Sequence, residues 1–146
     1  MQVAFYTGMP DKLGYACRVL RKAYRSGSRV IVCAPLQVLA AFDRQLWTFE
    51  SADFVPHVLQ KDATSPVPSH MADTPVWLAA PGVEPPHHDL LVNLGSELVP
   101  GFQSFARVIE LISTAPDDKQ AGRARWKHYV ERGYVLTHHE VGAGSR

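Results

Sequence analysis

Apolar residues in the first third of the chain follow two spacings in turn, one typical of strands and one typical of helices. Residues 2–7 form a short β-like run, and residues 29–34 form a nearly continuous apolar run, which is typical of a strand covered on both faces. Between them, residues 11–26 carry apolar side chains three and four positions apart, which predicts an amphipathic helix. Residues 35–47 repeat that spacing behind a proline, which suits the first turn of a helix. The order strand, helix, strand, helix favours a parallel sheet.

The other two thirds of the chain predict a mixture of strands and helices. Residues 48–75 are rich in proline, serine and aspartate, and we predict an irregular segment there. Residues 75–80 and 90–94 have the composition of two further strands. Residues 102–113 predict a third helix, because four apolar side chains recur at helical spacing. Those side chains are Phe102, Phe105, Ile109 and Ile112. Residues 134–139 predict a last strand.

Length and composition indicate one globular domain. Apolar residues make up 46% of the 146 residues and charged residues 20%, a balance typical of a folded chain rather than a disordered one. No apolar run approaches the roughly 20 residues of a membrane helix, and the N-terminus lacks the basic region of a signal peptide. We therefore predict a cytoplasmic protein with a single α/β domain over residues 1–146. Its sheet is expected to be largely parallel, flanked by helices and Rossmann-like or nucleotide-binding-like, with a flexible tail at 141–146.

The densest positive charge lies near the C-terminus. Residues 119–132 contain five basic residues and one acidic residue, a local net charge of +4, whereas the whole chain carries only +1. Asp117 and Asp118 precede this segment and Gly133 follows it, as acids and glycine do at the two ends of a helix. We predict a helix of roughly four turns here.

A helical projection sorts the side chains of this segment. One side is apolar and aromatic, and consists of Gly122, Trp126, Tyr129 and Val130. A line of cations at i, i+4 and i+8 borders that side: Lys119, Arg123 and Lys127. Arg125 and Arg132 fall well away from it. Two interpretations are open. The helix packs its aromatic side into the core and its cations are merely solvated, or the basic border and the aromatic edge bind an acidic ligand with an apolar tip.

Signatures of catalysis or of cofactor binding are missing from the sequence. The turn after the first strand, TGMPDKLG, has neither the glycine spacing of a dinucleotide site nor the Lys-Ser/Thr of a phosphate loop. The pairs His87-His88 and His138-His139 each lie at a predicted strand, where neighbouring side chains point to opposite faces and make poor joint metal ligands. Cys17 and Cys33 are expected to be buried reduced thiols. We expect no catalytic residue, no metal and no cofactor.

Six segments occur in an order that points to one family: FYTG, LW at 46–47, FVPH at 54–57, DLLVNL at 89–94, FxxFxRVIE at 102–110 and AxRxRWKxY at 121–129. Together they resemble the chi subunit of bacterial DNA polymerase III, a clamp-loader accessory protein. The resemblance covers nearly the whole chain. It implies a nucleotide-binding-like fold without catalysis of its own, within a replication complex of the bacterial cytoplasm and nucleoid.

The resemblance also implies partners and binding residues. One surface would bind the acidic C-terminal tail of single-stranded-DNA-binding protein, which ends in an apolar residue and a phenylalanine with its free carboxylate. Another would bind the psi subunit of the clamp loader, where present, or a helicase-family protein, so that contact with single-stranded DNA is indirect. The tail positions carried over are Lys119, Arg123, Trp126, Lys127, Trp47 and Ile112. The psi or helicase positions are Phe54, Val55 and Pro56.

These residues suit the tail chemically. Arg123 is the best candidate for the terminal carboxylate, because a guanidinium can bind it through two hydrogen bonds. Lys119 and Lys127 would attract the aspartates, and the phenyl ring would lie against Trp47, Ile112 and Trp126. Two alternatives stay open: direct nucleic-acid binding, since residues 11–26 are also basic, and a nucleotide-dependent enzyme on a Rossmann-like sheet.

Overall fold

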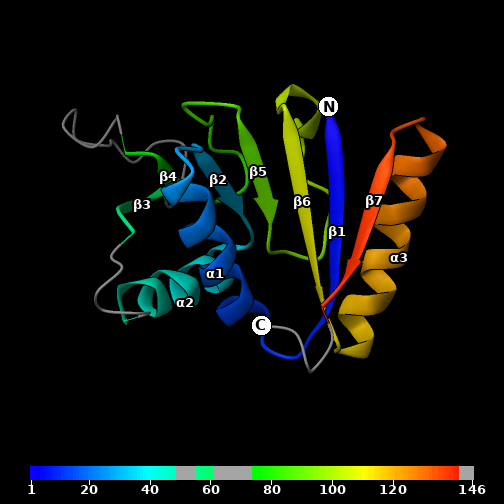
Figure 1. Cartoon of the computed structure of the whole chain (residues 1–146), viewed down its shortest axis with the longest axis horizontal. Coiled ribbons are helices and arrows are strands. Elements are labelled where there is room, and N and C mark those ends of the chain that lie inside the picture. Colours follow the sequence, from blue (N-terminus) through cyan, green and yellow to red (C-terminus); the bar gives the residue numbers. More distant parts are fainter. Residues whose placement is uncertain (49–54, 61–73, 142–146) are drawn as a thin grey trace.

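The computed structural model describes residues 1–48, 55–60 and 74–141. It contains one seven-stranded sheet with the strand order β3-β4-β2-β5-β6-β1-β7, in which every pairing is parallel (Figure 1). The strands are β1 (Gln2–Met9), β2 (Val30–Cys33), β3 (His57–Gln60), β4 (Val76–Ala79), β5 (Leu90–Asn93), β6 (Arg107–Ser113) and β7 (Leu136–Glu140). The helices are α1 (Lys12–Arg25), α2 (Leu36–Thr48), a short 3-10 helix (Phe102–Ser104) and α3 (Pro116–Glu131). The predicted parallel α/β fold is confirmed.

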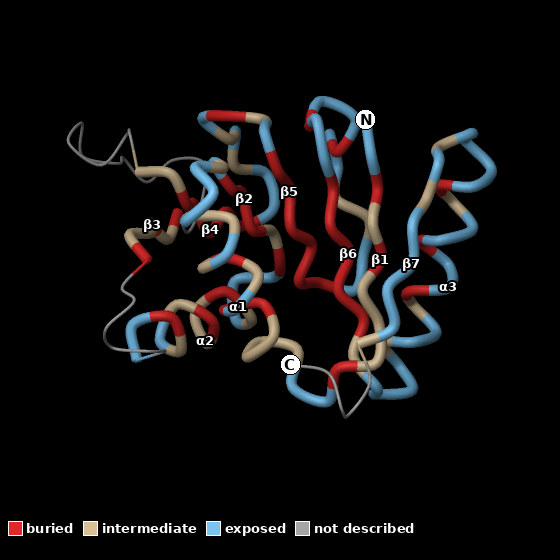
Figure 2. Tube along the Cα trace, viewed as in Figure 1, coloured by how far each residue is buried: buried red, intermediate tan, exposed pale blue. Residues whose placement is uncertain are grey.

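Helices cover both faces of the sheet. On one face, α1 and α2 pack against a core that includes Met9, Ile109 and Leu111. On the other face, Tyr129 of α3 packs with Phe5 of β1 and Ile112 of β6. Because neighbouring residues of a strand point to opposite faces, Ile112 and Leu111 belong to different cores. Figure 2 shows the central strands buried and α3 buried only along a narrow stripe.

The prediction of a helix over 102–113 was wrong. Only Phe102–Ser104 form a short 3-10 helix, Phe105 is extended (φ −90°, ψ 145°), and Arg107–Ser113 form β6 between β5 and β1. A strand buried on both faces has a continuous apolar run, whose spacing cannot be told from that of a buried helix. Isoleucine and valine favour the strand, and two neighbouring strands satisfy its backbone groups.

The prediction of an irregular segment over 48–75 was also wrong in part. His57–Gln60 form β3, an edge strand that pairs in parallel with β4. Residues 49–54 and 61–73 lie outside the described residues, as do residues 142–146 of the predicted tail. The other predicted strands and helices are present, with boundaries that differ by a few residues.

Both cysteines are free thiols on the apolar segments where they were expected. Cys17 is buried in the core beneath α1, and Cys33 is half-buried at the end of β2. Burial raises the pKa of each thiol to about 11, so both are protonated at neutral pH. In the described part of the chain, no helix is long and apolar enough to cross a membrane.

Candidate peptide-binding cleft

A cleft of about 650 Å³ opens at the carboxyl ends of β1, β6 and β7, beside the first half of α3. This edge is where ligands commonly bind in open parallel sheets. The lining residues are Phe5, Thr7, Gly8, Pro10, Ile112, Ser113, Thr114, Lys119, Gly122, Arg123, Trp126, His138 and Glu140. Four of the six predicted tail residues are therefore brought together: Lys119, Arg123, Trp126 and Ile112.

The base of the cleft is apolar because α3 approaches β6 closely. Gly122 faces Ile112 so tightly that a Cβ atom at residue 122 would overlap the Ile112 side chain. Trp126, which is 36% exposed, meets the edge of Phe5 with 5.0 Å between ring centroids and 72° between ring planes. Phe5, Ile112 and one side of Trp126 thus form a surface that can hold an apolar side chain.

Substituting Gly122 with alanine is expected to destabilise the protein. The added methyl group has no free volume against Ile112, so α3 or β6 must shift, and overpacking of this kind costs about 1–3 kcal/mol. Denaturant unfolding followed by circular dichroism measures the change. Gln120→Ala, at an exposed position of α3, is the matched control and should change stability by less than about 0.5 kcal/mol. A Gly122→Ala protein as stable as wild type would show that the helix has room to move.

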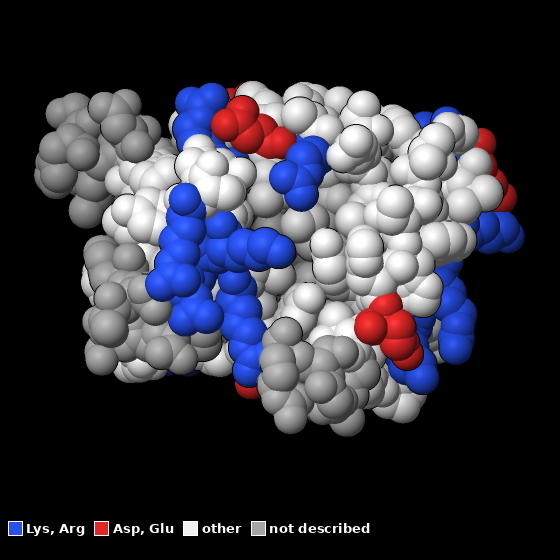
Figure 3. All heavy atoms as spheres, viewed as in Figure 1, with Lys and Arg blue, Asp and Glu red and all other residues white. Residues whose placement is uncertain are grey.

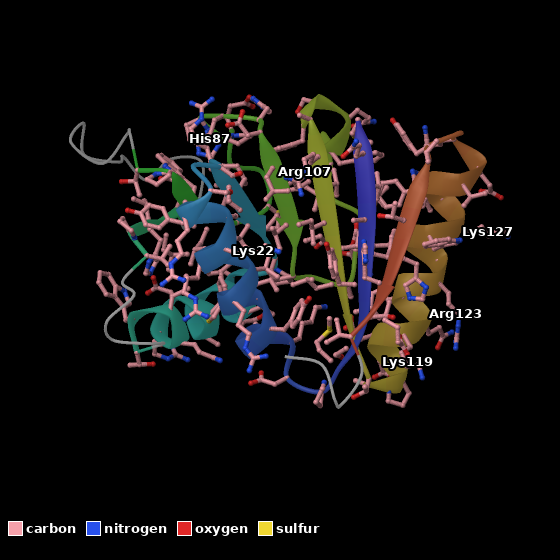
Figure 4. All side chains as sticks on the ribbon, in the orientation of Figure 1. Lys22, His87, Arg107, Lys119, Arg123 and Lys127 are labelled. Carbon is pink, nitrogen blue, oxygen red and sulfur yellow. The ribbon has the colours of Figure 1, made fainter. Side chains whose placement is uncertain are left out.

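Three cations run along the outer side of α3, as labelled in Figure 4. Lys119 and Arg123 line the cleft, whereas Lys127 lies a turn farther along the helix and is not a lining residue. All three are exposed, and no ion pair within the described residues involves any of them. Figure 3 shows basic side chains at the α3 edge of the molecule, where Figure 4 labels these three residues, and a second basic group over α1. The cations of α3 are thus available to an acidic ligand.

The first turn of α3 is tied to the sheet by an acidic residue. Asp118 accepts hydrogen bonds from the backbone nitrogen of Ser113 at 2.7 Å and from the Lys12 ammonium at 3.0 Å. Burial raises the pKa of Asp118, but these two donors outweigh it, so the net pKa lies below the usual value. Burial lowers the pKa of Lys12, and Asp118 opposes that shift. Asp118, which directly precedes Lys119 in the sequence, is therefore paired with Lys12.

The wall opposite α3 carries a polar cluster on β1 and β7. The Thr7 hydroxyl donates to Oε2 of Glu140 at 2.7 Å, and it lies 2.7 Å from Nε2 of His138. The His138 ring lies edge-on to Trp126, with 6.1 Å between ring centroids. His139 points to the other face, where it stacks on Tyr6 at 4.5 Å. The two histidines thus diverge, as predicted from their positions in a strand.

Trp47 lies outside the cleft, contrary to the expectation that it borders the tail site. It lies in the last turn of α2 on the other face of the sheet, is 56% exposed, and contacts the His57 ring with 4.8 Å between centroids. His57 is fixed by Asp43 at 2.9 Å and by the carbonyl oxygen of Val55 at 2.8 Å. Trp47 therefore lies close to the predicted psi-binding segment. The α2 helix and α3 cover opposite ends of the sheet, as Figure 1 shows.

The predicted psi-binding residues have different environments. Val55 is 3% exposed and belongs to the core, so it cannot contact a partner in this conformation. Pro56 is half-buried next to it. Phe54 lies outside the described residues.

Comparison with known proteins identifies the family. Residues 1–137 match the family described as DNA polymerase III chi subunit, HolC. The DNA polymerase III subunit chi of Pseudomonas aeruginosa is 38% identical over 135 residues, which cover 89% of this chain and 87% of that protein. The chain belongs to the DNA polymerase III chi subunit family.

More distant chi subunits match a similar length. The one from Haemophilus influenzae is 30% identical over 129 residues, covering 87% of this chain and 85% of that protein. The one from Escherichia coli is 26% identical over 122 residues, covering 82% of this chain and 79% of that protein. The resemblance drawn from the six sequence segments is confirmed.

A buried polar network holds α3 of this chi-family chain in place behind the cleft. Glu110 of β6 has no exposed surface, and it accepts hydrogen bonds from Nε of Arg125 and from the Tyr129 hydroxyl, both at 2.8 Å. Asn93 Nδ2 donates to the same carboxylate at 3.1 Å, and Nη1 of Arg125 donates to the Ser96 carbonyl at 2.7 Å. Burial raises the pKa of Glu110, against the opposing effect of Arg125 and the three donors.

Sequence reasoning missed this network. Arg125 was placed away from the aromatic side of the helix and Val130 upon it, yet Arg125 is 3% exposed and Val130 is 52% exposed. The buried stripe of α3 is Gly122, Arg125 and Tyr129. The available signal was Glu110 itself, because an acid inside the apolar run VIELI requires a buried partner.

The geometry of a metal centre is not found in the described part of the chain. No group of three or more histidine, cysteine or acidic side chains lies close enough there to hold a metal ion. In the turn between β1 and α1, the Asp11 side chain caps α1 by accepting a hydrogen bond from the Gly14 nitrogen at 3.0 Å.

Proposed function

We propose that this chain is a non-catalytic adaptor of the DNA polymerase III clamp loader that binds the acidic C-terminal tail of single-stranded-DNA-binding protein in the cleft beside α3. The observation that carries the proposal is the pairing of a basic border with an apolar base. Lys119 and Arg123 line one wall, and Trp126, Phe5 and Ile112 offer a surface for a ring. Membership in the chi subunit family supports the same assignment.

Each part of the tail has a matching part of the cleft. The terminal carboxylate would accept two hydrogen bonds from the Arg123 guanidinium, since the planar donors match a carboxylate. The terminal phenyl ring would lie over Ile112 and against Trp126. Lys119 and, farther out, Lys127 would attract the aspartates that precede the ring, an effect that acts more on association rate than on affinity.

The test is a calorimetric titration of the protein with a synthetic acidic tail peptide, beside the same peptide without its last phenylalanine. Both peptides carry the same aspartates. If the cleft holds the ring, the shortened peptide should bind at least tenfold more weakly, because a buried aromatic side chain contributes about 1.5–3 kcal/mol. Equal affinities would reduce the site to a merely basic surface.

We also propose that a second surface, defined by Trp47 and Pro56, binds the psi subunit or a helicase-family protein. Tryptophan is over-represented among the residues that contribute most of the binding energy of protein interfaces. Trp47 is 56% exposed, and its ring contacts the ring of His57. The cleft is lined by residues of α3 and Trp47 belongs to α2. These two helices lie at opposite ends of the sheet (Figure 1), so one chain could bind two partners at once.

Trp47→Ala is therefore expected to weaken binding to psi, or to the helicase-family partner, by about 2 kcal/mol or more. Affinity for the tail peptide should stay within twofold of wild type, since Trp47 does not line the cleft. Co-purification and surface plasmon resonance measure the first quantity, and peptide titration measures the second. If this variant is folded but no longer binds the tail peptide, Trp47 belongs to the tail site after all.

The protein is expected to have no ATPase or nuclease activity. At the sheet edge where nucleotides bind in related folds, this chain has a cleft with an apolar base. In the turn after β1, the Asp11 side chain accepts a hydrogen bond from the Gly14 nitrogen. Phosphate release and DNA cleavage should equal those of a heat-inactivated sample. Reproducible turnover in independent preparations would instead support the nucleotide-dependent enzyme.

Direct nucleic-acid binding is a second candidate function, favoured by the basic side chains over α1 (Figure 3). Arg18 and Lys22 are exposed there. Fluorescence anisotropy with a single-stranded oligonucleotide, in the absence of single-stranded-DNA-binding protein, separates the two candidates. The adaptor requires no binding in this experiment, whereas the alternative requires salt-sensitive binding that is lost in Lys22→Ala.

A further inference from the structure

The two walls of the cleft carry opposite charge. The α3 wall presents Lys119 and Arg123, whereas the β7 wall presents Glu140. An acidic peptide in the cleft is therefore attracted on one side and repelled on the other. If the Glu140 carboxylate only made the strand more soluble, it would lower the affinity for an acidic peptide and contribute nothing to its recognition. A role in selecting the peptide would explain its position.

Glu140 is held in place by a hydrogen bond from Thr7 rather than left free. A hydroxyl has a single proton, and Thr7 donates that proton to Oε2 of Glu140 at 2.7 Å. The oxygen of Thr7 must then accept from Nε2–H of His138, which lies 2.7 Å away. This chain of donors, from His138 to Thr7 to Glu140, links two adjacent parallel strands, because Thr7 is paired with Glu140 in the register of β1 and β7. The carboxylate is thereby fixed on the cleft wall.

We propose that Glu140 is a specificity-determining residue of the cleft, which selects acidic peptides whose last side chains are apolar and whose carboxylates all lie on the α3 side. This inference rests on the proposed function. Glu140 repels a carboxylate that approaches β7, so a peptide with an acidic side chain at its tip is rejected. A peptide with an apolar tip brings no negative charge to the β7 wall, and its terminal carboxylate faces Arg123.

Thr7 is the positioning residue in this arrangement. Without its hydroxyl, the Glu140 side chain is free to turn into solvent, where salt and water screen its charge. Thr7→Val should therefore reduce the discrimination against acidic tips in the same direction as Glu140→Gln, but by less. Thr7→Ser keeps the hydroxyl and should preserve the discrimination of wild type.

The experiment is a thermodynamic cycle measured by calorimetry. The protein variants are wild type, Glu140→Gln and Glu131→Gln, and the last removes one negative charge at an exposed position of α3 that does not line the cleft. The peptides are the acidic tail peptide and a version in which the apolar residue before the final phenylalanine is replaced by glutamate. The selectivity of each protein is the ratio of its two dissociation constants, and the coupling is the change in that ratio.

We expect Glu140→Gln to bind the tail peptide about three- to tenfold more tightly at low salt and to lower the selectivity ratio at least threefold. Glu131→Gln should change both affinities equally and leave the ratio unchanged. If Glu140→Gln behaves as Glu131→Gln does, or binds the tail peptide more weakly, the proposal about Glu140 is overturned while the tail site stands. If wild type binds neither peptide, the proposed function fails and this inference fails with it.

Discussion

Arg123→Ala is expected to weaken binding of the acidic tail peptide about ten- to a hundredfold without changing the fold. A hydrogen bond to a charged group contributes about 1.5–3 kcal/mol, and 1.4 kcal/mol corresponds to a tenfold change in affinity. Arg123 is exposed, lines the cleft and belongs to no ion pair within the described residues. Its removal should therefore lower the affinity for the peptide and leave the free energy of unfolding unchanged. Calorimetric titration measures the affinity, and a thermal melt confirms that the variant is folded.

Arg132→Ala is the matched control, because it removes the same group from the C-terminal end of α3, away from the cleft. It should bind the peptide within about twofold of wild type. Lys127→Ala should have an intermediate effect, since Lys127 does not line the cleft and an ammonium group is strongly hydrated. All affinities should fall as salt rises, because ions screen exposed charges. A folded Arg123→Ala protein that binds the tail as well as wild type does would place the site elsewhere.

Arg125→Ala, two residues from Arg123 on α3, is expected to reduce stability rather than peptide binding. It should lower the free energy of unfolding by about 3–5 kcal/mol, because it leaves the Glu110 carboxylate buried without its cation. Glu110 has no exposed surface and the Arg125 side chain is 3% exposed, so water cannot replace the lost partner without a local opening. Denaturant unfolding measures the change, with Arg123→Ala as the control within about 0.5 kcal/mol of wild type.

The loss of stability in Arg125→Ala should grow with pH. Burial raises the pKa of Glu110 in the wild type, and removal of Arg125 takes away a charge that opposes this shift. A carboxyl whose pKa is higher in the folded state binds its proton more tightly there. Stability therefore falls as pH rises above the usual glutamate pKa of about 4.3, until the raised folded-state pKa is passed. The variant should be closer to wild type at pH 4.5 than at pH 7. A pH-independent difference would show that packing, not charge, is what Arg125 contributes.

A double substitution tests whether the instability of Arg125→Ala comes from the unpaired charge of Glu110. Arg125→Met with Glu110→Gln removes both charges and keeps similar volumes, so it should be considerably more stable than Arg125→Ala. If the double variant is as unstable as the single one, the hydrogen bonds of Tyr129 and Asn93 to the Glu110 carboxylate matter more than the ion pair.

Short-range patterns in the sequence determined most of the elements and the family. Apolar spacing placed α1 and α2, and the acids and glycine around residues 117–133 placed α3, because these signals act within one or two helical turns. The same local order carried the six segments that indicated the chi family. The line of Lys119, Arg123 and Lys127 was likewise visible, because residues four apart lie on one side of a helix.

Only the tertiary structure decided what surrounds those residues. Arg123 and Arg125 look alike in the sequence, but β6 places Glu110 beneath Arg125 and leaves Arg123 at the cleft. The segment 102–113 fits a helix by spacing, and it is a strand because β5 and β1 pair with it on either side. Trp47 was predicted to border the tail site, but it belongs to α2, which packs against β3 and β4 at the other end of the sheet. Thr7 and Glu140 lie 133 residues apart in the sequence and meet because β1 and β7 are neighbours. Each of these outcomes depends on contacts between distant residues, which no local spacing encodes.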